Sequence, residues 1–174
     1  KPEKGMQNLA TASECARKSK MHKEVKILTW YLYLSELVAH DPQNEAISEY
    51  SSLITVYAPK LKDKPSSYGI ELITANAYIL RVPYAKPVLR PVMYALALTY
   101  LERLDSMPAV AEEDYGIFYD MSGLSVSVNE RKNMISYIEE QIRNFSGEEW
   151  YNAAVKAYDM NDDDGKYGIA SLYC

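Results

Sequence analysis

The stretch HKEVKILTWYLYLSELVA, residues 22–39, decides the fold of this chain. Its apolar side chains recur at steps of three and four residues along more than one side of a helix: Val25, Ile27, Leu28, Tyr31, Leu32, Leu34 and Val38. A helix that is apolar over so wide a surface is buried on two sides. We therefore predict a helix over residues 22–39 that lies inside a stack of helices.

The same periodicity recurs along the rest of the sequence. It predicts helices over residues 8–19, 43–57, 66–80, 92–104, 127–144 and 146–158. Asp41-Pro42 has the composition of a helix start, and Ser127 to Glu130 and Ser146 to Glu149 each form a capping box. Short links between helices favour antiparallel neighbours. We expect a single all-α domain over residues 1–174, built as stacked antiparallel helical hairpins, with an irregular helical bundle as the alternative.

The tripeptide Tyr-Gly-Ile occurs three times, beginning at Tyr68, Tyr115 and Tyr167. Self-similarity at long and nearly regular spacing is the sequence signature of a repeat architecture. We expect the three copies to occupy equivalent positions at helix starts, and the third to open a last helix.

The segment Trp150-Tyr151-Asn152-Ala153-Ala154, followed by Tyr167-Gly168-Ile169-Ala170-Ser171-Leu172-Tyr173, resembles the Sel1-like repeat, a relative of the tetratricopeptide repeat. The run from Asp41 to Ala46 is similar to a link between tetratricopeptide units, and Trp30-Tyr31 is similar to Trp150-Tyr151. The spacing of the copies is longer than the units of these families. The resemblance implies a helical array that binds other proteins.

Composition limits the classes of partner and compartment. The net charge of −5 argues against nucleic acid as a partner, because phosphates require basic surfaces. No apolar run is long enough to span a membrane. We slightly favour the cytoplasm, and the periplasm or secretion if a signal preceded Lys1. Cys15 and Cys174 are expected to be unpaired thiols, with a disulfide in an oxidising compartment as the alternative.

The clearest chemical signal is the acidic loop that begins at Asp159. The oxygen ligands Asp159, Asn161 and Asp163 alternate ahead of a glycine, as in a calcium loop. Gly165 is one position later than that pattern requires, and Ala170 stands where a Glu is needed. A solvated acidic turn is therefore the favoured interpretation, with calcium the less favoured one and no other cofactor expected.

The chain shows no nucleophile motif, metal-ligand spacing or Gly-rich phosphate loop, so we expect a protein that is not an enzyme. The favoured function is a protein-binding scaffold or adaptor, including an immunity protein that neutralises a basic bacterial toxin. A coat-like structural subunit and a calcium- or small-molecule-binding protein are the alternatives.

The expected partner is a neutral or basic protein. Tyrosine is abundant, with 16 copies against 2 of Phe, and it suits binding faces because it is rigid and amphipathic. The candidate binding residues are Tyr33, Tyr84, Tyr119, Tyr151, Asp120, Glu148 and Glu149.

Overall fold

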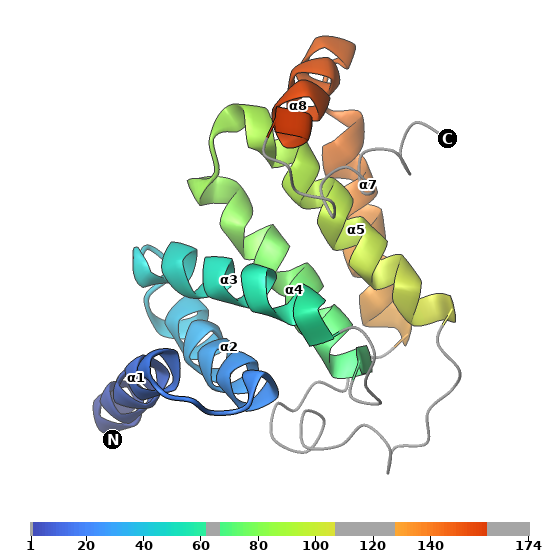
Figure 1. Ribbon diagram of the computed structural model, residues 1–174. Coiled ribbons are helices and arrows are strands. Elements are labelled where there is room, and N and C mark those ends of the chain that lie inside the picture. Colours follow the sequence, from blue (N-terminus) through green and yellow to red (C-terminus); the bar gives the residue numbers. More distant parts are fainter. Residues whose placement is uncertain (1, 62–66, 107–127, 160–174) are drawn as a thin grey trace.

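The computed structural model describes residues 2–61, 67–106 and 128–159, and over these ranges the chain is helical without strands (Figure 1). The all-α class predicted from the sequence is confirmed. The α-helices are α1 Pro2–Lys18, α2 Lys23–His40, α3 Ala46–Tyr57, α4 Ser67–Arg81, α5 Arg90–Ser106, α7 Val128–Arg143 and α8 Gly147–Asp159. Three 3-10 turns accompany them: η1 Ala58–Leu61, η2 Val82–Tyr84 and η3 Pro87–Leu89. No helix in this part of the chain combines the length and apolar character needed to cross a membrane.

Helices that follow one another in the chain also pack against one another. From α1 to α5 each helix contacts the next, and α7 and α8 both pack on α5. Figure 1 shows α2 and α3 running in opposite directions, as do α4 and α5. The packing order is therefore that of consecutive helical hairpins.

The interior has two apolar cores, which share helix α4. The first core lies among α2, α3, η1 and α4, and the second among α4, α5, α7 and α8. Ile73 faces the first core and its neighbour Leu72 faces the second, and both side chains are fully buried. An apolar sequence on all sides of a helix is typical of a buried helix. Helix α4 therefore joins the two cores.

Helix α2 is buried as its sequence predicts. Trp30 is 1% exposed, packs edge-to-face on the Tyr57 ring at 5.2 Å, and donates a hydrogen bond from Nε1 to the Ser13 carbonyl at 3.2 Å. Lys26 is also buried, and its Nζ donates to the Ser19 carbonyl at 2.7 Å. A cation suits this place, because carbonyls near the end of a helix carry partial negative charge. These two bonds fix α1 against α2.

The contact between α4 and α5 is close because α5 carries small residues. Ala95 and Ala97 are at most 1% exposed, as expected for alanines that let two helices approach. An ion pair also joins these helices, with Arg103 Nη1 at 3.7 Å from Oε2 of the buried Glu71. The Arg103 guanidinium lies over the Tyr100 ring, 4.8 Å from its centre.

The helix starts confirm one capping prediction and correct another. Ser146 and Glu149 form the predicted capping box: the Ser146 amide donates to Glu149 Oε2 at 2.8 Å, and the Glu149 amide donates to Ser146 Oγ at 3.3 Å. The predicted start of α3 at Asp41-Pro42 is wrong. The Asp41 carboxylate instead accepts from Asn44 Nδ2 at 2.8 Å, and Asn44 Oδ1 accepts from the Ala46 amide at 3.0 Å. Helix α3 therefore begins at Ala46, three residues after the start predicted at residue 43.

The first Tyr-Gly-Ile copy lies in the first turn of α4, at a helix start as expected. The copies at Tyr115 and Tyr167 lie outside the described residues, so their equivalence stays a prediction.

Candidate functional site

A groove of about 710 Å³ lies where the two cores meet. Its walls come from the end of α2, the link to α3, the end of α4, turn η2, the start of α5, and α7. The lining residues are Val38, Pro42, Gln43, Ile47, Ile79, Leu80, Val82, Pro83, Tyr84, Arg90, Tyr94 and Tyr137. The volume lies within the range of about 300–1,000 Å³ that is typical of ligand pockets. Most of the lining is apolar, and the polar groups are tyrosine hydroxyls, one amide and one guanidinium.

Prolines shape one wall of the groove. Pro83, Pro87 and Pro91 cannot donate the backbone hydrogen bonds that would join α4 to α5 as one helix, so the chain turns through η2 and η3. Tyr84 ends turn η2 and is 40% exposed at the rim. Its hydroxyl donates to the Pro42 carbonyl at 3.4 Å, which ties η2 to the link between α2 and α3.

The polar end of the groove is built by Arg90, Tyr94 and Tyr137. Arg90 and Tyr94 lie one turn apart on α5, so they share a face of the helix. Burial raises the pKa of Tyr94 to about 12, and the hydroxyl and charge of Tyr137 act in the same direction. The Arg90 guanidinium opposes this rise in the Tyr94 pKa. Tyr94 therefore stays a neutral phenol, able to donate a hydrogen bond, throughout the physiological pH range.

Arg90 has no acceptor for its Nε atom among the residues that the structure describes. That nitrogen is shielded from solvent and makes no hydrogen bond there, and no carboxylate in the same ranges forms an ion pair with the guanidinium. A guanidinium donates through five N–H groups in a planar fork that matches a carboxylate. Among the described residues that line the groove, Arg90 is therefore the cation whose accessible Nη atoms can donate to a ligand.

A run of aromatic rings holds α7 and α8 against α5. Tyr94 packs against Tyr137 with ring centres 6.4 Å apart and against Phe145 at 6.1 Å. Phe145 packs edge-to-face on Trp150 at 6.0 Å. These contacts position Tyr137, which is 48% exposed, on the side of the groove formed by α7.

The tyrosines predicted from the sequence do not gather in one place. Tyr84 lines the groove. Tyr33 packs edge-to-face on Tyr50 at 5.0 Å, and Tyr151, on α8, is 67% exposed; neither lines the groove. Tyr119 and the neighbouring Asp120 lie outside the described residues.

The predicted acidic and metal-binding residues lie only partly within the described parts of the chain. Glu148 is exposed on α8, whereas Glu149 is engaged in the capping box. Asp159 is the last residue of α8, and Asn161 and Asp163 lie outside the described residues. Within 2–61, 67–106 and 128–159, no group of three or more metal-binding side chains is found.

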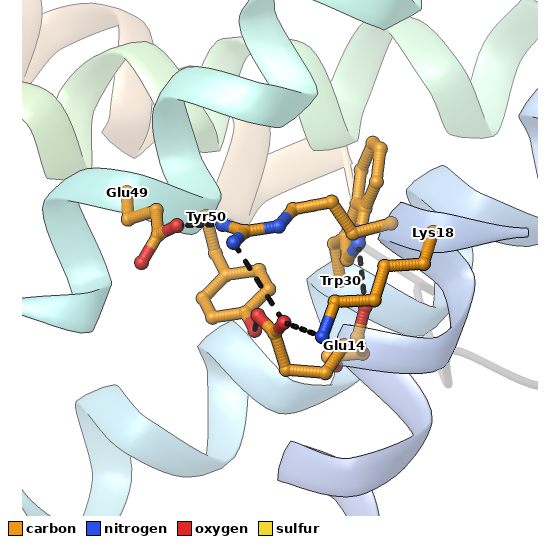
Figure 2. Close-up of polar contacts among 7 residues, drawn as sticks. Glu14, Lys18, Trp30, Glu49 and Tyr50 are labelled. Carbon is orange, nitrogen blue, oxygen red and sulfur yellow. Dashed lines mark hydrogen bonds and ion pairs between the residues drawn. The ribbon is translucent and has the colours of Figure 1, made fainter.

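A second polar cluster joins α1 to α3 (Figure 2). Tyr50 donates to Glu14 Oε1 at 3.0 Å, Lys18 pairs with Glu14 at 3.6 Å, and Arg17 pairs with Glu49. The Tyr50 hydroxyl lowers the pKa of Glu14, while burial and then Glu14 raise the pKa of Tyr50. These groups satisfy one another, so the cluster has a structural role and leaves the groove as the candidate site.

No protein-family model, curated protein or solved structure matches this chain. The resemblance to Sel1-like and tetratricopeptide repeats therefore stays a prediction.

Sequence reasoning missed Arg90, Tyr94 and Tyr137. The sequence held one indication for two of them: Arg90 and Tyr94 are four residues apart, on one face of a helix, directly after a proline-rich break. Nothing local relates them to Tyr137, which reaches the groove only through the packing of α7 on α5.

Proposed function

We propose that this protein is a protein-binding module and that the groove holds a short segment of its partner. The observation that carries this proposal is the rim of the groove, where Tyr84 and Tyr137 are 40% and 48% exposed beside apolar walls. Tyrosine is enriched at binding faces because its ring gives a large rigid contact and its hydroxyl can find a partner.

The openness of the rim favours a peptide segment over a small molecule. Pockets for small molecules bury most of their ligand and are usually enclosed. Here two large aromatic side chains at the rim remain accessible to solvent, so a chain can enter and leave the groove while its middle residues contact the apolar walls.

The overall charge bears on the partner as a whole. A net charge of −5 favours encounter with a neutral or basic protein. An immunity protein that binds a basic toxin is the special case of this proposal, and its support is the acidic charge alone.

The test is selection of random peptides displayed on phage against the immobilised protein. We expect enriched peptides to bind the wild type and to lose at least about tenfold in affinity with Tyr84→Ala or Tyr137→Ala, because truncated aromatic anchors commonly cost more than 1.4 kcal/mol. Tyr151→Ala is the matched control, since that tyrosine is more exposed and does not line the groove.

Circular dichroism and thermal melting confirm that each variant keeps its fold. The proposal is wrong if no peptide is enriched, or if enriched peptides bind the groove variants as tightly as they bind the wild type.

A further inference from the structure

Among the described residues that line the groove, Arg90 is the one that carries a positive charge. Its Nε atom is cut off from solvent without an acceptor, and within the described ranges the side chain has no carboxylate beside it. Protein atoms cover Nε, so a ligand in the groove cannot reach that atom. The two Nη atoms are not covered in this way and the side chain is partly exposed, so an acceptor in the groove can reach them.

We propose that the bound segment is an apolar peptide with an acidic side chain, and that the Arg90 guanidinium binds its carboxylate. This inference rests on the proposed peptide-binding role of the groove. A carboxylate offers two acceptor oxygens to the planar fork of an arginine, which makes a charge-assisted and directional pair. Tyr94 and Tyr137 also line the groove, and the Tyr94 hydroxyl is hydrogen-bonded to that of Tyr137.

The rest of the lining determines what flanks the acidic residue. Val38, Ile47, Ile79, Leu80 and Val82 contribute apolar side chains to the other walls. A segment that is acidic throughout would leave carboxylates unpaired against these walls, and a basic residue at the polar end would repel Arg90. The geometry therefore fits one acidic side chain with apolar neighbours.

The acidic net charge of the chain does not conflict with this assignment. Net charge acts at long range, on the rate at which partners meet, and is screened by salt. A cation in a sheltered groove acts on the docked segment. A partner that is basic overall can therefore dock through a segment that carries one acidic side chain.

The acid in question is a side chain within the segment and not the carboxyl terminus of the partner. The groove is open along a rim with two exposed tyrosines, so it does not require the bound chain to end there. Peptides with blocked termini test this choice directly.

The experiment uses three pools of short synthetic peptides with acetylated amino termini and apolar or serine residues at the random positions. The first pool has one fixed Glu and an amidated carboxyl terminus. The second has Gln in place of that Glu, and the third has the same Gln with a free carboxyl terminus. Binding of each pool is measured by isothermal titration calorimetry at low and at high salt.

We expect the Kd of the wild type for the Glu pool to be lower than that for the Gln pool by a factor of about ten or more, because a hydrogen bond between two charged groups is stronger than one to a neutral amide. Arg90→Gln should abolish this preference and leave the affinity for the Gln pool unchanged. Arg90→Lys should retain part of the preference, because it keeps the charge and loses the fork. Lys86→Gln is the matched control, since it removes the same charge from an exposed residue that does not line the groove, and it should keep the full preference.

The two proposals fail in different ways. Equal affinity of the wild type for the Glu and Gln pools overturns the inference about Arg90 and leaves the peptide-binding role standing. Preference for the pool with the free carboxyl terminus overturns the choice of an acidic side chain. Absence of binding by all three pools overturns both proposals. The comparison of pools on the wild type needs no variant, so the test holds even if an Arg90 variant fails to fold.

Discussion

Leu72→Ala and Ile73→Ala test whether α4 makes the two cores one cooperative unit. The two residues are neighbours in the chain, each is 0% exposed, and they face different cores. Truncation of a fully buried Leu or Ile to Ala removes apolar contact and leaves a cavity, which costs about 2–5 kcal/mol of the free energy of unfolding. Val56→Ala is the control, because Val56 is 53% exposed and such a surface change stays within about 0.5 kcal/mol.

The two tryptophans of the chain report on the two cores separately. Trp30 is buried in the first core, and Trp150 packs on Phe145 beside the second. Urea unfolding followed by fluorescence in Trp150→Phe and Trp30→Phe backgrounds therefore isolates each signal. We expect each α4 variant to lower the midpoint seen by both tryptophans, because loss of α4 removes one wall from each core.

Two results would contradict this reasoning. If Leu72→Ala moved only the Trp150 transition and Ile73→Ala only the Trp30 transition, the cores would unfold independently in spite of the shared helix. A loss below about 1 kcal/mol for either variant would show that the site relaxes to fill the cavity.

Three further predictions concern single polar contacts. Ser146→Ala removes the capping box with Glu149 and should lower the free energy of unfolding by about 1 kcal/mol in urea titrations, and an unchanged midpoint would refute the role of the cap. The pKa of Glu14 is lowered from its ordinary value of 4.5 chiefly by the Tyr50 hydroxyl. The free energy of unfolding of the wild type should therefore exceed that of Glu14→Gln at neutral pH, and this difference should disappear as the pH falls below 4.5 through the folded-state pKa; a difference independent of pH would refute the assignment. The pKa of Tyr94 is raised from 10.0 to about 12, so the free energy of unfolding should fall as the pH rises from 10.0 towards 12. In a titration followed by phenolate absorbance, Tyr94→Phe should remove the part of the change that occurs at the highest pH, and a curve without that loss would contradict the assignment.

Most helices could be predicted from the sequence because their apolar spacing is strong. The predicted start at residue 8 was too late for α1, which begins at Pro2. Proline suits a first helical turn, and Gly5 is tolerated inside the helix. The start of α3 was missed for a different reason: two side chains, Asp41 and Asn44, bond to each other in the turn, and sequence alone does not show which partner a capping residue takes.

The site was much less predictable than the fold. Tyr84 was proposed from the sequence because it has no place in an apolar stripe, and it lies at the groove. The other polar groups of the groove come together only through tertiary packing, since Tyr137 and Arg90 belong to helices far apart in the chain. Glu149 was predicted both as a capping residue and as a binding residue; the structure confirms the capping contact, and the binding role stays a prediction.

The position of the groove has a thermodynamic consequence. Its walls come from helices of both apolar cores, so a bound peptide would contact both cores at once and hold them together. By linkage, a ligand that binds only the folded chain adds about 2.7 kcal/mol to the free energy of unfolding when its concentration is about 100 times its Kd. Any motion that separates α3 from α5 would break contacts between such a peptide and one wall of the groove. If the groove binds a peptide as proposed, binding and rigidity are therefore coupled, and relative motion of the two cores costs least when the groove is empty.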